Sequence, residues 1–337
     1  MNWDCHNCTL CCRLFALGPV APEIVAGLQA RGIEQDWAPA ADGWVDETPQ
    51  GLFLTHRDDS CVFLRDDGLC AVHALYGPEA KPAFCRTFPF TVVEQAGGVV
   101  HAVREDCGGT WRSLIGGTPA SQAIEALPDQ APRLVWGDEP VQVLPGVGIA
   151  GDDWLALEDH LVAQVRDDLD PQENLCRLRD ALLGALRRAP PDPDPARSAA
   201  CVEGLRQNLA AALGPAASPA DAQGTAARFL AGVATGLAAA APGHAAVAPL
   251  APDAERYFAL VIRQHLRGKA FRASGAVCWG LGLVSLGVAL ARARTPKTDL
   301  AALAPWHVRW SRFTRNQGAR ALLHQHRDTL WEALLHR

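Results

Sequence analysis

Hydrophobic and polar positions are spaced in two different ways along the chain. After residue 151, apolar residues recur every three or four positions over long stretches, which is typical of amphipathic helices. Before residue 112, apolar runs are short and are separated by glycine, proline and acidic residues, which is typical of short strands and turns. The pattern predicts an α+β fold class, with a small N-terminal domain of short strands followed by a mainly α-helical domain.

The change in spacing also predicts the domain boundaries. Residues 1–112 are expected to form the N-terminal domain, residues 113–150 a connector rich in glycine and proline, and residues 151–337 the helical domain. Within the helical domain, the spacing predicts helices over residues 154–169, 171–188, 196–213, 221–239 and 252–267.

Residues 273–291 form a stretch of nineteen residues without a charged side chain. This length is sufficient for a helix to cross a membrane. The stretch nevertheless contains four glycines and two serines, and no other segment resembles a membrane span. We therefore favour a buried core helix here and expect no membrane span.

Two hairpins are predicted in the N-terminal domain. Residues 61–64 and 69–72 have strand character and are joined by an Asp-Asp-Gly turn, a common hairpin signal. Residues 91–103 predict a second hairpin around a turn that contains two glycines. The first hairpin would bring Cys61 and Cys70 close together.

Charge and cysteine content narrow the possible functions. The chain has 337 residues and a formal net charge of −6, which excludes a globally basic nucleic-acid-binding protein. No basic and apolar leader precedes Cys5, so we expect no signal peptide and a cytoplasmic protein. Eleven cysteines are present, and eight lie before residue 108. Clustered thiols in a reducing compartment indicate a metal site rather than disulfides.

The run Cys5-His6-Asn7-Cys8-Thr9-Leu10-Cys11-Cys12 carries the strongest chemical signal in the chain. Gaps of two residues let successive thiolates surround one centre, as they do in zinc and iron–sulfur sites. Thiolates prefer such soft centres to magnesium or calcium. The candidate metal ligands are Cys5, Cys8, Cys11, Cys12, Cys61, Cys70, Cys85 and Cys107. Eight sulfurs can fill two four-coordinate sites, or one site with four cysteines to spare.

The remaining histidines and cysteines near these patterns have simpler interpretations. His6 and His73 can bind metal, but with eight cysteines available we expect them outside the inner ligand shell. Cys176, Cys201 and Cys278 lie in apolar helical stretches and are interpreted as core residues.

Cys11 and Cys12 are adjacent and are therefore expected to have different roles. If the opening run is helical, Cys5, Cys8 and Cys12 share one face. If it is a loop wrapped around a centre, Cys5, Cys8 and Cys11 bind together and Cys12 is separate. In either case we expect one of the adjacent pair to join a distal cysteine such as Cys85, and the other to turn toward Cys61, Cys70 or Cys107.

Together these motifs resemble the CxxCxxCC cysteine-cluster family of zinc- or iron-chelating domains, which includes flagellin lysine-N-methylase. The resemblance covers about the first 110 residues and rests on the opening run, Cys61-Val62-Phe63-Leu64, Gly68-Leu69-Cys70 and residues 81–90, Lys-Pro-Ala-Phe-Cys-Arg-Thr-Phe-Pro-Phe. It implies the four opening cysteines, Cys61, Cys70 and Cys85 as metal-site residues, and Cys107 matches a later family cysteine. His73 stands in place of a tyrosine, and Lys81-Pro82 in place of Arg-Pro.

The resemblance also implies a candidate activity. This is methyl transfer from S-adenosylmethionine to a lysine of a protein substrate such as flagellin, with an iron–sulfur cluster as a cofactor. Two alternatives remain open: a non-catalytic zinc module that supports partner binding, and an electron-transfer or metal-handling protein. Three cysteines in ferredoxin-like steps tilt the choice of metal toward iron.

Two further motifs carry weaker signals. Residues 146–151 fit the pattern G-x-G-x-x-G, but the following βαβ unit that would make them a nucleotide loop is missing. We interpret them as a turn, with Asp152 capping the next helix. Residues 292–337 hold nine basic against three acidic residues. Their aromatic positions Trp306, Trp310 and Phe313 predict an amphipathic surface helix, with docking of an acidic partner as the alternative.

Overall fold

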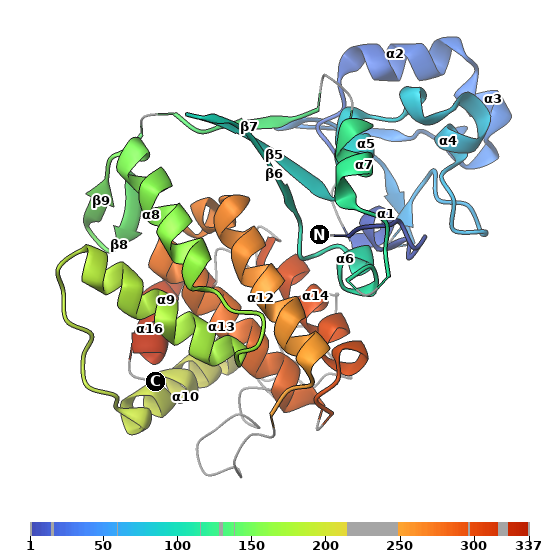
Figure 1. The fold of residues 1–337 in the computed structure, drawn as a ribbon. Helices are drawn as coiled ribbons and strands as arrows, with labels where there is room; N and C mark the ends of the chain where they lie inside the picture. Colours follow the sequence, from blue (N-terminus) through green and yellow to red (C-terminus); the bar gives the residue numbers. More distant parts are fainter. Residues whose placement is uncertain are drawn as a thin grey trace. The chain divides into compact units, whose positions relative to one another are not determined.

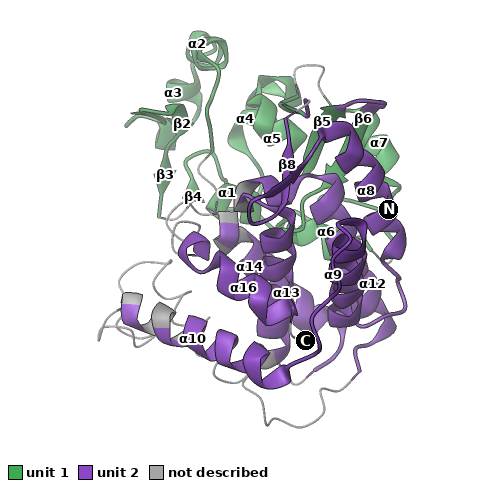
Figure 2. Cartoon of the chain, turned by 90° about the vertical axis from the view of Figure 1, so that its left-hand side faces the viewer, with its two compact units in different colours: residues 1–94, 99–135 green, residues 95–98, 136–337 purple. Residues whose placement is uncertain are grey.

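The computed structural model describes residues 2–14, 17–58, 60–114, 116–127, 131–137, 139–213, 249–295, 297–315 and 323–335. It divides the chain into two compact units, which Figure 2 distinguishes by colour. Unit 1 consists of residues 1–94 and 99–135, and unit 2 of residues 95–98 and 136–337. The division after residue 135 lies inside the stretch predicted as a connector. Short strands in unit 1 and long helices in unit 2 confirm the α+β class.

Unit 1 is built from short elements (Figure 1). Its helices are α1 (Leu10–Leu14), α2 (Pro22–Ala30), α3 (Ile33–Asp36), η1 (Ala38–Ala40), α4 (Ala71–Tyr76), η2 (Pro78–Ala80), α5 (Ala83–Thr87), α6 (Gly108–Arg112) and α7 (Ala120–Glu125). Its strands are β1 (Val45–Thr48), β2 (Gly51–Leu54), β3 (His56–Arg57), β4 (Ser60–Cys61), β5 (Phe90–Gln95), β6 (Gly98–Val103) and β7 (Arg133–Val135). The strands form the pairs β1-β2 and β3-β4 and the three-stranded sheet β6-β5-β7.

The hairpin predicted over residues 91–103 is confirmed as β5 and β6, whereas the hairpin around Cys61 and Cys70 is only partly formed. β4 pairs with β3, and a single antiparallel bridge joins Leu64 to Cys70. The strand predicted over residues 69–72 is wrong, because Cys70 is the N-cap of α4. The acidic turn forms as expected, but the apolar residues after it continue as a helix that buries Ala71 and Val72.

Unit 2 is mainly helical. Its elements are β8 (Val141–Leu144), β9 (Val147–Ile149), α8 (Gly151–Gln164), α9 (Pro171–Ala185), α10 (Pro195–Leu213), α12 (Pro252–Arg267), η3 (Ala270–Ser274), α13 (Val277–Arg294), α14 (Leu300–Arg315) and α16 (Arg327–Leu335). The helix predicted over residues 252–267 has the bounds of α12, and α9 and α10 match their predictions closely. The helix predicted over residues 221–239 lies outside the described residues.

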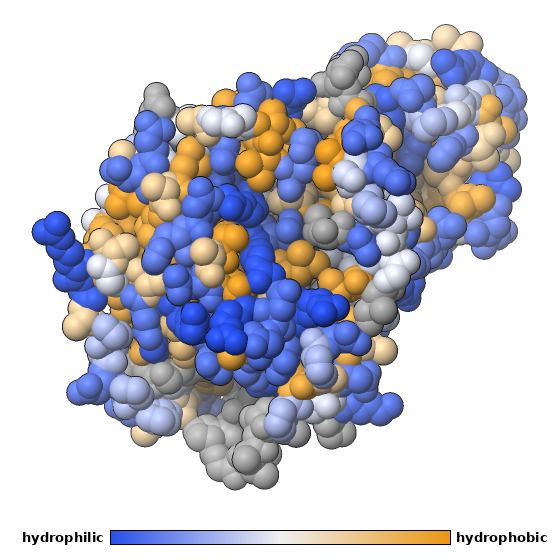
Figure 3. Space-filling view, viewed as in Figure 1, coloured by the Kyte–Doolittle hydropathy of each residue, from blue (hydrophilic) through white to orange (hydrophobic). Residues whose placement is uncertain are grey.

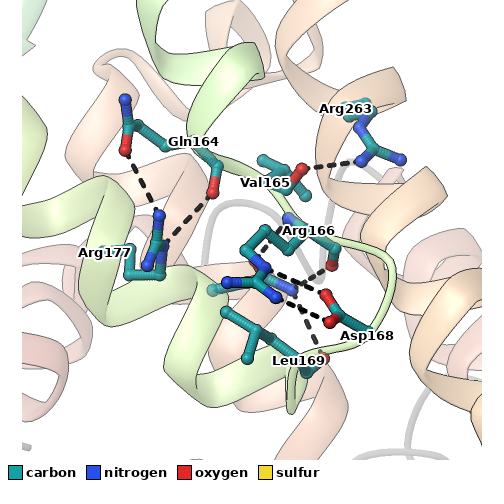
Figure 4. Close-up of polar contacts among 8 residues, drawn as sticks. Gln164, Val165, Arg166, Asp168, Leu169, Arg177 and Arg263 are labelled. Atoms are coloured by element: carbon teal, nitrogen blue, oxygen red, sulfur yellow. Dashed lines mark hydrogen bonds and ion pairs between the residues drawn. The ribbon is translucent and has the colours of Figure 1, made fainter.

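The predicted helix over residues 154–169 ends earlier than expected, at Gln164. The chain then turns between Val165 and Leu169 (Figure 4). The buried Asn174 side chain closes this turn. Its Oδ1 accepts the Arg166 amide at 2.8 Å, and its Nδ2 donates to the Arg166 carbonyl at 2.8 Å. Arg263 of α12 donates to the Val165 carbonyl at 2.6 Å. These bonds satisfy backbone groups that a continuing helix would have satisfied.

The uncharged stretch around residues 273–291 forms the buried core helix that we favoured. Within α13, small residues allow close packing: a Cβ at Gly287 would lie 2.3 Å from Cδ1 of Trp310. A Cβ at Gly280 would lie 2.7 Å from Nε2 of His265. Among the described residues, the structure contains no helix that is both long and apolar enough to cross a membrane.

The basic C-terminal region contributes α14, whose aromatic face packs inward. Trp310 is buried, and its indole N–H donates to the Leu283 carbonyl of α13 at 2.9 Å. Arg309 is exposed, and its guanidinium carbon lies 4.9 Å from the ring centroid of Trp306. The side chain of Phe313 lies outside the described residues. The face around Trp310 therefore belongs to the core of unit 2.

Polar and apolar residues alternate over the surface in Figure 3. The exposed large apolar side chains among the described residues are Leu69, Leu75, Val99 and Val135. Single exposed apolar residues are common on protein surfaces and need no partner to explain them.

Candidate metal centre

The opening run is a loop that turns into a short helix. Asn7 and Thr9 have left-handed backbone angles, with φ of 48° and 56°, which interrupt any helix before Leu10. Cys8 therefore lies in the loop, whereas Cys11 and Cys12 lie in α1. Cys8 and Cys11 therefore belong to different elements, although the loop interpretation placed both in one loop.

Five cysteines meet beside the main hydrophobic core of unit 1. We call Cys11, Cys12, Cys61, Cys70 and Cys85 the five-cysteine cluster. The Sγ atoms of Cys11 and Cys12 are 3.8 Å apart. Cys61 is buried in the core, and Cys12 and Cys70 pack against it. The cluster thus joins α1, β4, the start of α4 and α5.

Thiols of the cluster raise one another's pKa. Burial raises the pKa of Cys61 to about 12, and nearby Cys70 and Cys11 contribute to the rise. The pKa of Cys85 is also raised, first by burial and then by Cys61, Cys70 and Cys11. Each thiolate would therefore disfavour the others, so a full set of thiolates needs a cation among them.

A lysine that the sequence did not single out as part of the centre lies near this cluster. The ammonium group of Lys81 opposes the rise in the pKa of Cys11 and of Cys85. The rise at Cys11 comes first from the hydrogen bond with Cys12. Lys81 stands just before α5, where the resemblance noted an arginine in other members. Its positive charge can partly balance thiolates in the cluster.

Cys8 and Cys107 form a second group, which we call the Cys8–Cys107 pair. Cys107 is buried and is the N-cap of α6, and its Sγ accepts the Gly109 amide at 3.3 Å. A Cβ at Gly108 would lie 3.1 Å from Sγ of Cys8. The two glycines after Cys107 therefore allow the opening loop to approach this closely.

Adjacent Cys11 and Cys12 both lie in α1, with their sulfur atoms 3.8 Å apart. We expected the two cysteines to have different roles at the metal site, and this division stays a prediction.

Ser113, the residue that follows α6, forms hydrogen bonds with the opening loop. Its Oγ accepts the Asp4 amide at 2.8 Å and donates to the Gly109 carbonyl at 2.8 Å. Nε2 of His6 lies 3.0 Å from the same oxygen. The Asp4 carboxylate accepts the Thr118 amide at 2.8 Å, which lowers the pKa of Asp4. No sequence motif predicts this contact, because Asp4 and Ser113 are more than 100 residues apart.

We predict that Ser113→Ala loosens the opening loop. The substitution leaves the Asp4 amide without its acceptor, which typically costs about 1–3 kcal/mol when the group is buried. Thermal unfolding of the full chain measures this loss, with Ser60→Ala as a control because the Ser60 hydroxyl bonds at the surface. Equal stability of the Ser113→Ala and Ser60→Ala variants would contradict the role given to Ser113.

The other candidate residues lie apart from the cluster. Cys5 is exposed, and its Sγ lies 3.6 Å from Oδ1 of Asn7. His73 is exposed on α4. The remaining three cysteines lie in helices, as predicted, but only Cys278 of α13 is a core residue. Cys176 of α9 and Cys201 of α10 are half-buried. All eleven cysteines are free thiols.

The donors of the five-cysteine cluster fit a soft metal in type, because thiolates bind zinc and iron–sulfur centres. Sulfur atoms bound tetrahedrally to one zinc ion at about 2.3 Å lie about 3.8 Å apart. The Cys11–Cys12 separation of 3.8 Å has this value. Over the described parts of the chain, no group of three or more histidine, cysteine, aspartate or glutamate side chains is already close enough to hold a metal ion. Binding therefore requires the remaining sulfurs to move closer together.

The glycine pattern at residues 146–151 is a β-hairpin. β8 and β9 pair antiparallel across Gly146, whose φ is 69°. Helix α8 follows directly, and its N-cap is Ala150. The turn interpretation is therefore confirmed, whereas the cap predicted at Asp152 is wrong. Asp152 instead lies in the first turn of α8, where a negative charge is favourable.

Comparisons with known proteins agree with the cysteine pattern. The model of the CxxCxxCC family, described as "Putative zinc- or iron-chelating domain", matches residues 4–108. No curated protein and no solved structure matches the chain. The matched segment includes the five-cysteine cluster and the Cys8–Cys107 pair. Residues 4–108 of this chain are therefore similar to the CxxCxxCC domain, as their cysteine spacing predicted.

Proposed function

We propose that the five-cysteine cluster binds a thiophilic metal centre, and that this centre is an iron–sulfur cluster. The observation that carries the proposal is the meeting of five cysteines from four separate segments beside one hydrophobic core. Core packing does not require cysteine at these five positions, because another small apolar residue would fill the same space as a cysteine. Soft thiolate donors favour zinc, copper(I) or iron–sulfur centres.

A bound centre would supply a covalent cross-link among these segments and, if it contains iron and sulfide, a site for electron transfer. The chain itself supplies the thiols, the apolar surroundings that exclude water, and the nearby positive charge of Lys81. Burial and hydrogen bonding to the sulfurs are among the properties by which a protein sets the potential of such a centre.

Metal and sulfide analysis of the anaerobically purified full chain tests the proposal. We expect iron together with acid-labile sulfide, and loss of both in Cys61→Ser/Cys85→Ser. The matched control Cys201→Ser alters a thiol of α10 and is expected to keep the wild-type content. If the purified protein is colourless and carries zinc without sulfide, the centre is not an iron–sulfur cluster. The domain would then be interpreted as a structural zinc module for partner binding. Purified protein without thiolate-bound metal would contradict the proposal itself.

Methyl transfer from S-adenosylmethionine to a lysine of a protein substrate such as flagellin is the activity we propose to examine first. Its support is the family resemblance of the N-terminal domain. Calorimetric titration of S-adenosylmethionine into metal-loaded protein is the direct test. Binding followed by methylation of a lysine would support the activity, and absence of binding would favour electron transfer or metal handling.

We propose the cytoplasm as the location of the protein. The support is the state of the cysteines, because all eleven thiols are free. Proteins with many unpaired thiols persist in reducing compartments.

A further inference from the structure

A hollow in unit 2 lies outside the segment that the family model matches. Residues 136–142, which lead into β8, border one side of it, and η3 with the following Gly275 borders the other. The empty space, with the open mouth included, is about 460 Å³. Sites for small molecules usually have roughly 300–1,000 Å³, so the size of the hollow suits a ligand with a single ring.

Two aromatic side chains form a corner of this hollow. The ring centroids of Trp136 and Phe271 are 5.9 Å apart, and the two rings are inclined by 80°. Phe271 is buried and also packs on Trp154, with their ring centroids 4.9 Å apart. A Cβ at Gly280 would lie 2.7 Å from the Cβ of Phe271, so the backbone of α13 holds Phe271 closely. The aromatic corner is therefore fixed by the core of unit 2 and can receive a flat apolar group.

The exposed cation Arg272 borders the same hollow. Its guanidinium carbon lies 5.6 Å from the ring centroid of Trp136. Among the described residues, this guanidinium donates one hydrogen bond, to Oε2 of Glu139 at 3.2 Å. The guanidinium group has five N–H donors in a planar fork that matches a carboxylate. Arg272 can therefore bind a carboxylate whose apolar part contacts Trp136.

Glu139 indicates that this arginine accepts a carboxylate from outside the core. Its side chain is 84% exposed, and such exposed ion pairs contribute little to stability. A ligand carboxylate can therefore displace Glu139 from Arg272 at a small cost. The second cation beside the Trp136 ring is Lys269, but it is fully buried and paired with Glu158. Arg272 is thus the cation that a ligand can reach.

We propose that this hollow binds a small aromatic carboxylate, with the carboxylate on Arg272 and the ring in the corner formed by Trp136 and Phe271. The ligand replaces Glu139 as the partner of Arg272. None of these residues carries a thiol, so the inference does not rest on the metal centre. It gives unit 2 a ligand site of its own, separate from the domain matched over residues 4–108.

Fluorine NMR titration of para-fluorobenzoate with the purified full chain tests the proposal. We expect saturable binding at millimolar concentrations, and weaker binding of the neutral para-fluorobenzamide, which has the same shape. Unlabelled benzoate should displace the probe more effectively than phenyl phosphate, because the fork of Arg272 already holds a carboxylate.

Substitutions at the ion pair should change the affinity in opposite directions. Arg272→Gln should weaken binding of para-fluorobenzoate about tenfold or more, because it removes the charged donor. Glu139→Gln should strengthen binding by up to about fivefold, because it removes the competing carboxylate. Arg309→Gln is the matched control, because Arg309 is also exposed and its guanidinium carbon lies 4.9 Å from the ring centroid of Trp306.

Incorporation of fluorotryptophan shows where the ligand binds. The Trp136 signal, assigned by its absence in Trp136→Phe, should shift when unlabelled benzoate is added. The Trp306 signal, assigned in the same way, should stay unchanged.

Several results would overturn the proposal. These are no saturable binding, equal affinity for the benzoate and the benzamide, equal losses in Arg272→Gln and Arg309→Gln, or an unchanged Trp136 signal. Stronger competition by phenyl phosphate than by benzoate would also contradict it, since the ligand would then be a phosphate ester. None of these measurements involves the thiols of unit 1, so each of these results would leave the proposed function standing.

Discussion

Removal of the metal is expected to unfold unit 1 and to leave unit 2 folded. Unit 1 consists of short helices and two- or three-stranded sheets, which rarely provide enough apolar burial for independent stability. Structural zinc sites in small domains contribute about 10–16 kcal/mol of apparent binding free energy to folding. We expect most of the stability of unit 1 to come from the five-cysteine cluster in this way.

Limited proteolysis followed by mass spectrometry measures this effect. After chelation, cleavage should concentrate between residues 1 and 135, while the helices of unit 2 remain resistant. Cys61→Ser/Cys85→Ser should give the same pattern without a chelator, and Cys201→Ser should resemble untreated wild type. Cleavage that increases equally in both units, or does not increase at all, would contradict this role of the metal.

Lys269→Met is expected to destabilise unit 2 by about 3–5 kcal/mol, the usual cost of removing one member of a buried ion pair. Lys269 and Glu158 have fully buried side chains and form an ion pair. Glu158 also accepts the Trp154 indole N–H at 3.0 Å and an N–H of Arg267 at 3.3 Å. The Lys269 ammonium lies 5.3 Å from the ring centroid of Trp136. In the variant, Arg267 would remain on Oε1 of Glu158 and the Trp154 indole on Oε2, so the Oε2 atom loses its ammonium partner.

Glu158→Gln should be destabilising in a way that depends on pH. Burial lowers the pKa of Lys269, and Glu158 opposes this effect, so the substitution lowers the pKa further. The folded state then binds fewer protons than the unfolded state, whose lysine has a pKa of about 10.4. Stability of the variant therefore rises as the pH increases toward that value, and the penalty is largest at low pH.

Urea unfolding of unit 2 at neutral and alkaline pH measures both effects. Asp168→Asn is the control, because the Arg166–Asp168 pair is exposed and such pairs contribute less than about 1 kcal/mol. A Lys269→Met variant as stable as Asp168→Asn would show that the buried pair does not hold the helices. A pH-independent loss in Glu158→Gln would contradict the charged state assigned to Lys269.

Local pattern predicted those parts of the fold in which local and tertiary preferences agree. Helix α12 begins at a proline and ends before a glycine, and its apolar residues repeat at helical spacing, so its bounds followed directly. The hairpin of β5 and β6 also has a local signal in its two turn glycines, both with positive φ. In contrast, the chain after Cys70 has strand-like composition and becomes α4, because Ala71 and Val72 reach the core as a helix.

The candidate site was predictable as a list of ligands but not as an arrangement. Spacing identified the cysteines, because four of them in eight positions is a chemical signal that no packing requirement explains. Spacing could not show that Cys8 joins Cys107 across about 100 residues, since that depends on two glycines and the contact at Ser113. The left-handed backbone conformations of Asn7 and Thr9 could not be predicted either, because neither residue type requires that conformation.

X-ray absorption at the metal edge of the anaerobically purified full chain shows whether thiolates of the five-cysteine cluster hold a metal centre. We expect a shell of sulfur atoms around the metal, with short iron–iron scattering if the centre is an iron–sulfur cluster. We also expect loss of that shell in Cys61→Ser/Cys85→Ser. A shell of oxygen and nitrogen atoms, or an unchanged sulfur shell in that variant, would contradict this expectation.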